Sequence, residues 1–202
     1  VGAIGFACSH FHSNAAVVKV SSPDGATDIT VCDEGSRPAY SVTYAGQPML
    51  LQSPLGMKLH FADYTSGVGI DMSNLRTDSV AVEYSLPTIK RSNVSHRAVT
   101  AVVPFTKAGK RVFDLELHLS DNNVAMRYRV YRSGDNQCAR VERETTGFSL
   151  PEGTTTFLRP YSKALTGWME TFPSYETHYQ PDAPTGRNGE GAGYTFPCLF
   201  HV

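Results

Sequence analysis

The chain has 202 residues, a mass of 22.0 kDa and a formal charge of -1, with 18 Lys and Arg residues against 19 Asp and Glu residues. Its length suits a single domain with a sizeable core. Because the charge is nearly balanced, no net field attracts nucleic acid or an anionic membrane surface, and we expect no nucleic-acid partner.

Residues 1–16 have the composition of a leader, separate from a folded domain at 17–202. A small apolar run at 1–7 is followed by polar residues and by Ala15 and Ala16. This pattern is typical of the end of a secretory signal, with a small-x-small cleavage site at 13–15 or with Cys8 as a lipid-anchored cysteine. The alternative is a disordered leader without a targeting role. No stretch approaches the roughly 20 apolar residues of a membrane-spanning helix, so we expect no membrane span.

The four cysteines are widely separated along the chain. They form no C-x-x-C pair that would indicate zinc, and they are too few to hold together a small secreted scaffold. We therefore predict that Cys32, Cys138 and Cys198 are thiols in the core.

Between residues 17 and 155, period-two alternation dominates and helical periodicity is nearly absent. Residues 114–119 (DLELHL) alternate strictly, and 39–44 and 80–84 alternate more loosely. Turn residues separate these runs, and 120–123 (SDNN) predict the clearest hairpin, joining 111–119 to 124–131. The fold class predicted is all-β, with stacked antiparallel sheets. The polar face of the second hairpin strand, rich in Arg and Tyr, is expected to meet solvent or another domain.

The pattern changes after Thr155, where Pro and Gly interrupt the chain up to Tyr194. We interpret 155–194 as a long loop region, and loops of that length in a compact domain are usually functional or disordered. Residues 194–202 predict the start of a buried apolar strand. From this ending we expect the 202 residues to be the front of a longer protein.

The loop region contains the best candidate site, the stretch TFPSYETHYQ at 171–180. Glu176 lies between Tyr175 and Tyr179, with Trp168 nearby. Flat aromatic faces beside a carboxylate are the composition of a sugar site, in which the acid binds hydroxyl groups or a hard cation. The alternative is a solvated loop glutamate beside ordinary packing aromatics.

Six motifs stand out along the chain: VSSPDG at 20–25, YSVTYAGQP at 40–48, SPLGM at 53–57, DNNVAMRY at 121–128, FSLPEG at 148–153 and PSYETHY at 173–179. In this order and spacing they resemble the N-terminal domain of glycoside hydrolase family 97, a family of calcium-dependent α-glucosidases and α-galactosidases common in Bacteroidetes.

The resemblance implies a β-super-sandwich that packs on the protein's own C-terminal (β/α)-barrel, which carries the catalytic carboxylates. It also implies that the N-terminal domain lends one glutamate to the active-site Ca²⁺, and by local motif that residue is Glu176. Calcium takes about 6–8 oxygen ligands, so the others would come across the domain interface. The substrate implied is an α-linked glycoside, cleaved at its terminal bond. Trp168, Tyr175, His178 and Tyr179 are candidates for contact with sugar or barrel.

Several consequences and alternatives accompany this resemblance. The chain alone is expected to hydrolyse nothing, and residues 193–200 are more similar to the retaining, galactosidase-like branch. Together, the leader at residues 1–16 and the resemblance to this family imply an exported protein that is periplasmic or associated with the outer membrane. Two other functions stay open from the residues themselves: a carbohydrate-binding, lectin-like β-sandwich, and a structural module that binds no ligand.

Overall fold

The computed structural model describes residues 15–88, 90, 92–131, 138–161, 180–189 and 193–202. These residues form an all-β fold of antiparallel strands, as the alternation predicted. The chain divides into two compact units, Val1–Ser149 and Leu150–Val202, which are described separately below.

The first sheet of the first unit has the order β1-β2-β3-β4. Its strands are β1 (Val17–Ser21), β2 (Thr27–Cys32), β3 (Ala39–Tyr44) and β4 (Gln47–Pro54). The turn between β1 and β2 is closed by Asp24, whose carboxylate accepts hydrogen bonds from the Ser22 hydroxyl at 2.5 Å and from the Ala26 amide at 3.0 Å. A short side chain that satisfies backbone donors explains why this position suits a tight reversal.

The second sheet has the order β11-β10-β9-β7, and β8 pairs with β9 beside it. Its strands are β7 (Gly69–Ile70), β8 (Arg76–Ser85), β9 (Asn93–Lys107), β10 (Lys110–Ser120) and β11 (Asn123–Val130). The predicted hairpin is confirmed, because Ser120 pairs with Asn123 at its tip.

A third sheet, of order β12-β5-β6, completes the first unit. Its strands are β5 (Met57–Leu59), β6 (Ala62–Asp63) and β12 (Val141–Glu144). The helical elements in the described part of the chain are two short 3-10 turns, η1 (Glu34–Ser36) and η2 (Met72–Asn74).

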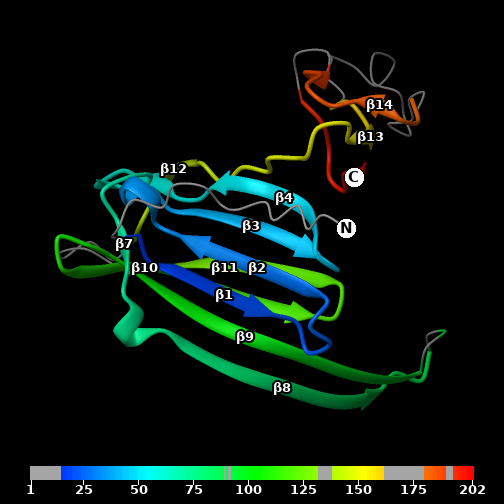
Figure 1. Cartoon of the computed structure of the whole chain (residues 1–202), viewed down its shortest axis with the longest axis horizontal. Helices are drawn as coiled ribbons and strands as arrows, with labels where there is room; N and C mark the ends of the chain where they lie inside the picture. Colours follow the sequence, from blue (N-terminus) through cyan, green and yellow to red (C-terminus); the bar gives the residue numbers. More distant parts are fainter. Residues whose placement is uncertain (1–14, 89, 91, 132–137, 162–179, 190–192) are drawn as a thin grey trace, which may run out of the picture. The chain divides into compact units, whose positions relative to one another are not determined.

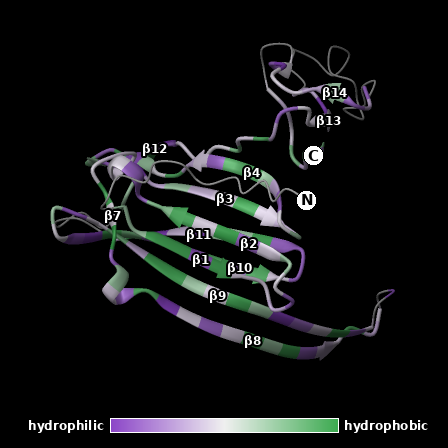
Figure 2. Cartoon of the chain, viewed as in Figure 1, coloured by the Kyte–Doolittle hydropathy of each residue, from purple (hydrophilic) through white to green (hydrophobic). Residues whose placement is uncertain are grey.

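The hydrophobic core lies between the first and second sheets, which are stacked in Figure 1. Buried residues alternate with less buried ones along much of β2 and along the second half of β10. Figure 2 colours the hydrophobic residues of these strands green. Leu115, Leu117 and Leu119 of β10 are each at most 3% exposed, whereas Glu116 and His118 between them are only half-buried. Phe105 and Phe113 stack with ring centroids 4.6 Å apart. Alternation in the sequence thus gives β10 one side that faces the core and one side that faces outward. The predicted sandwich of stacked antiparallel sheets is confirmed.

The prediction that three cysteines lie in the core is correct for one of them. Cys32 ends β2 and is buried, but Cys138 is exposed and Cys198 is half-buried. Cys138 precedes β12 and so belongs to no core-facing strand position, while the Cys198 thiol lies 3.5 Å from the Thr195 carbonyl in the second unit. Widely spaced cysteines therefore did not all mark core strands.

The second unit contains a small sheet of order β14-β13-β15. Its strands are β13 (Thr155–Phe157), β14 (Ala183–Pro184) and β15 (Leu199–His201). Two of these strands interrupt the stretch 155–194 that we predicted to be one long loop. The prediction of a buried final strand is wrong, because all three β15 residues are exposed and Leu199 is 64% exposed. Apolar composition without alternation did not specify which face would be covered.

In the described residues, no helix has the length and apolar character needed to cross a membrane.

Candidate functional site

The predicted site residues Glu176, Trp168, Tyr175, His178 and Tyr179 lie outside the described residues, as does Cys8. What the structure describes is the chain on either side of the segment 162–179. We call the described residues on both sides of this segment, 155–161, 180–189 and 193–195, the framework.

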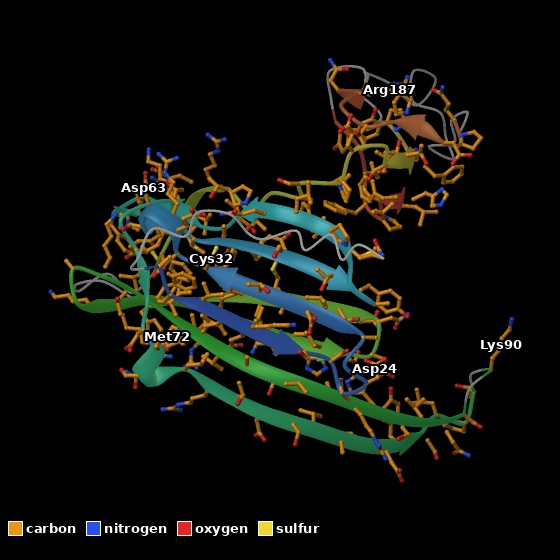
Figure 3. All side chains as sticks on the ribbon, in the orientation of Figure 1. Asp24, Cys32, Asp63, Met72, Lys90 and Arg187 are labelled. Atoms are coloured by element: carbon orange, nitrogen blue, oxygen red, sulfur yellow. The ribbon has the colours of Figure 1, made fainter. Side chains whose placement is uncertain are left out.

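The chain after this segment is attached to β13. Thr156 pairs with Ala183, and the buried Thr156 hydroxyl donates to the Ala183 carbonyl at 3.0 Å. The Thr155 hydroxyl donates to the Asp182 carboxylate at 3.2 Å. Close to the segment's end, the guanidinium of Arg187, labelled in Figure 3, donates to the side chain of Gln180.

The chain before this segment is attached to residues 193–195. Pro160 forms an isolated antiparallel bridge with Tyr194. The Tyr161 amide donates to the Gly193 carbonyl at 2.8 Å, and the Thr195 amide donates to the Arg159 carbonyl at 3.0 Å. The chain before residue 162 and the chain after residue 179 therefore belong to one hydrogen-bonded framework.

No group of three or more His, Cys, Asp or Glu side chains is gathered in the described part of the chain in a way that could hold a metal ion. A Ca²⁺ ion needs about 6–8 oxygen ligands. The described residues bring together no cluster of three carboxylates toward that number.

A buried carboxylate that sequence reasoning missed, Asp114, lies in the first half of β10. Asp114 is 1% exposed and receives two hydrogen bonds from the Arg111 guanidinium, at 2.6 and 2.7 Å, and one from the Tyr131 hydroxyl at 2.7 Å. The hydrogen bond to Asp114 raises the pKa of Arg111 and that of Tyr131. The alternation of this strand places Asp114 in register with Glu116 and His118, which predicts an outward-facing side chain, so the pattern carried no signal for its burial. Every oxygen is used internally, so the network braces the sheet.

The outer face of the second sheet carries a hollow of about 530 Å³ between β9, β10 and β11. The even-numbered residues of β9 and β10 face away from the core here, and Thr100, Glu116 and His118 line the hollow. Glu116 forms an ion pair with Arg127, whose side chain is 79% exposed. The expectation that the polar face of β11 meets solvent is confirmed for Arg127.

Three of the sequence motifs that carry the family resemblance meet at one junction. The Gly56 amide donates to the Tyr128 hydroxyl at 2.9 Å, and the Ser149 amide donates to the Ser53 hydroxyl at 2.9 Å. Gly56 has a φ of 119°, and a Cβ there would lie 2.6 Å from the Tyr64 carbonyl oxygen. The motif at 53–57 thus requires glycine for a backbone reason.

The fold defines the class of protein first: an all-β sandwich domain. A family model described as Glycosyl-hydrolase 97 N-terminal matches residues 20–202. The chain therefore belongs to this family, the N-terminal domains of family 97 glycoside hydrolases, which confirms the resemblance found in the sequence.

Known proteins agree with this assignment. A protein of Streptomyces bingchenggensis named "Probable retaining alpha-galactosidase" is 30% identical over 146 residues, covering 72% of this chain and 21% of that protein. A crystal structure of β-arabinopyranosidase is similar with a TM-score of 0.82 and 39% identity, covering 92% of this chain and 30% of that one.

A Glycoside Hydrolase Family 97 enzyme in complex with acarbose, from Pseudoalteromonas sp., is similar with a TM-score of 0.65 and 23% identity, covering 71% of this chain and 22% of that one. This last likeness shows the fold alone. The chain spans between about a fifth and a third of the length of these three proteins.

Proposed function

We propose that the chain is the N-terminal domain of a calcium-dependent, exo-acting α-glycosidase, an α-galactosidase or an α-glucosidase. The observation that carries this proposal is the family match over residues 20–202. In the proposed enzyme the domain packs on the protein's own C-terminal (β/α)-barrel. Its substrate is an α-linked glycoside.

Of the two sugars, galactose has the better support. The relative from Streptomyces that shares 30% identity is named a probable retaining α-galactosidase. The structure that shares 39% identity is named a β-arabinopyranosidase. A β-L-arabinopyranoside has the ring stereochemistry of an α-D-galactopyranoside without its hydroxymethyl group, so one pocket shape accepts both sugars. We therefore propose an α-galactoside, or a pyranoside of the same ring stereochemistry, as the substrate.

Glu176 is the residue of this chain proposed to reach the active site. A carboxylate is the donor that Ca²⁺ prefers, and a single one supplies at most two of the roughly 6–8 oxygens needed. When bound, calcium supplies positive charge that orients carboxylates and substrate hydroxyl groups. The framework at 155–161, 180–189 and 193–195 supports the proposal, because the chain on both sides of the segment that contains Glu176 is held in it.

The bond-breaking residues of this proposal belong to the barrel. Glycoside hydrolysis uses two carboxyl groups on either side of the scissile bond, and their separation decides whether the sugar configuration is retained or inverted. This chain contributes a ligand and an interface, so we expect no hydrolysis from the 202 residues by themselves. Trp168, Tyr175, His178 and Tyr179 are proposed contacts with the sugar or the barrel.

Isothermal calorimetry with Ca²⁺ tests the proposal on the full-length protein and on the 202-residue chain. We expect tight binding by the full-length protein, and at least about a hundredfold loss of affinity, or about 2.7 kcal/mol, in Glu176→Gln. Glu152→Gln is the matched control, because Glu152 is an exposed glutamate of the same unit, and it should change neither affinity nor turnover.

Other results would contradict the proposal in different ways. Equal calcium affinity in the 202-residue chain would show that no second domain is needed. Tight binding of free galactose or glucose by the chain alone would favour the lectin-like alternative. An unchanged affinity and turnover in Glu176→Gln would favour a structural module. A protein in which no barrel follows this domain would refute the glycosidase proposal itself.

We also propose that the protein is exported and is periplasmic or associated with the outer membrane, on the evidence of residues 1–16. Fractionation of cells expressing the natural gene tests location, and Cys8→Ser tests the lipid anchor. Release of the Cys8→Ser protein from membranes would support lipid attachment at Cys8. Unchanged fractionation would contradict it.

A further inference from the structure

Two histidines of the second sheet face each other on its outer side. His118 of β10 pairs with Thr100 of β9, and His96 lies four residues before Thr100 on the same face of β9. Ala98 lies between them in β9 and is only 1% exposed. The small side chain of Ala98 leaves room for two imidazoles to approach from either side.

The two rings lie end to end. Their Nε2 atoms are 2.9 Å apart, their planes differ by 5°, and their centroids are 5.2 Å apart. The centroid separation exceeds the Nε2 separation by about the diameter of one imidazole ring. Two parallel rings show this difference between the two separations when they lie nearly in one plane, with their Nε2 atoms pointing at one another. One Nε2 carries a proton and donates it, and the other accepts it.

A divalent transition metal would require a different arrangement of the same two rings. Bonds of about 2.0–2.1 Å from a tetrahedral ion place two imidazole nitrogens roughly 3.3 Å apart, with both Nε2 lone pairs aimed at the ion. From the observed 2.9 Å the two nitrogens must separate by a few tenths of an ångström, and each ring must turn by roughly 35° so that its lone pair points at the ion and no longer at the other ring. The donor ring keeps its single proton by moving it from Nε2 to Nδ1, so both rings bind in the neutral form.

We propose that His96 and His118 form a two-nitrogen binding site for a late first-row divalent ion, of the class of Cu²⁺, Ni²⁺ and Zn²⁺. Water completes the coordination, and the adjoining hollow of about 530 Å³, which His118 also lines, gives those water ligands space. Both ligands stand on directly paired strands, so their backbones are held by the sheet.

The site is distinct from the proposed calcium site in both position and chemistry. It is built from described residues of the first unit, and imidazole nitrogen suits copper, nickel and zinc but not the hard Ca²⁺ ion. With two protein ligands it should exchange its metal readily, unlike structural zinc sites with four. Its failure would leave the proposed glycosidase function unaffected.

The test is calorimetric titration of the metal-free 202-residue chain with Ni²⁺, Cu²⁺ and Zn²⁺ separately. The background carries His10→Ala, His12→Ala, Cys8→Ser and Cys138→Ser, which removes the imidazoles and the thiol of the leader and the exposed thiol of Cys138. We expect one equivalent of each ion to bind, and Cu²⁺ to bind more tightly than either Ni²⁺ or Zn²⁺. Ca²⁺ should not compete.

In this background His96→Ala or His118→Ala should each weaken binding at least about tenfold. His201→Ala, the matched control at an exposed histidine of β15, should leave it unchanged. Equal denaturation midpoints would show that the variants are folded, and the electron paramagnetic resonance of bound Cu²⁺ should lose nitrogen coupling in His118→Ala. Unchanged affinity in both single variants, or an unchanged spectrum, would overturn the proposal.

Discussion

The two units of this chain are stabilised in different ways. The first has a continuous core drawn from its two large sheets, with residues such as Ile29, Val103 and Phe113 completely buried. In the second, the buried residues among those described are Thr154, Thr156, Ala183 and Gly189. Among the described residues, hydrophobic burial stabilises the first unit, whereas in the second unit hydrogen bonds between short strands are the main contacts. The predicted site residues belong, by sequence, to the second unit.

The largest expected effect is on the free energy of unfolding, and it should differ sharply between a core residue of the first unit and an exposed residue of the second. Phe113→Ala removes a fully buried ring that stacks on Phe105, and we expect it to lower the free energy of unfolding by about 3–5 kcal/mol. Leu199→Ala in the second unit removes a side chain that is 64% exposed and should cost less than about 0.5 kcal/mol. Urea denaturation followed by circular dichroism measures both. Similar losses would contradict the comparison.

A smaller effect is expected from the backbone of the first unit. Gly56→Ala places a Cβ 2.6 Å from the Tyr64 carbonyl oxygen at a φ of 119°, and should cost about 2–3 kcal/mol. Gly46→Ala, the matched control, has a φ of 78° but open space around its Cβ, so strain alone should cost about 1 kcal/mol. Denaturation midpoints measure the difference. Equal losses would show that the close approach at Gly56 is relieved by local movement.

Alkaline pH should weaken the first unit, in part through the buried Tyr40. Burial, with a contribution from Tyr128, raises the pKa of Tyr40 to about 12, against about 10 for an exposed tyrosine. Between these values the unfolded chain releases a proton that the folded chain keeps, so stability falls as the pH rises.

Tyr40→Phe should flatten part of this alkaline decline. It also removes the hydrogen bond to the Gly147 carbonyl, at a cost of about 1 kcal/mol at neutral pH. Tyr84→Phe, at a side chain that is 46% exposed, should leave the pH dependence unchanged. Urea denaturation at neutral pH and in steps from about pH 10 to 12 measures both effects. An unchanged slope in Tyr40→Phe would contradict the assignment.

The smallest effect on global stability is expected in the second unit. Thr156→Val removes the buried hydrogen bond to the Ala183 carbonyl, and should speed amide exchange in β13 and β14 about tenfold, while global unfolding changes by less than about 0.5 kcal/mol. Thr155→Val, which removes an exposed contact with Asp182, should change exchange less. Hydrogen exchange read by mass spectrometry decides between these outcomes. A large global loss would show that the small sheet supports the whole chain.

The sequence predicted the features that depend on local patterns. Alternation at 114–119 identified a strand with one core face, and the turn residues at 120–123 identified its hairpin. The exposure of Cys138 and of β15 was not predicted, because the covered face depends on contacts distant in sequence. The pairing of His96 with His118 depends on strand register, which the alternation leaves open over such distances.

The candidate site divides in the same way. Local motif and composition selected Glu176, which stays a prediction because it lies outside the described residues. The framework on either side of its segment was missed, because β13 and β14 are only three and two residues long and carry no periodic signal. The position of such a short strand is determined by the segments of the same chain with which it pairs.

The strand β8 has a consequence for how the chain behaves in concentrated solution. Among the described strands it pairs only with β9, which leaves ten residues with one open edge, and nearly all of its side chains are exposed. An open edge is a template for strands of other molecules and so for aggregation. Arg76, Asp78 and Glu83 place charges along this edge, and between them Val80 and Val82 are apolar. We therefore expect the colloidal stability of the chain to depend on those three charges, because they oppose pairing of this edge with strands of other molecules at the two valines.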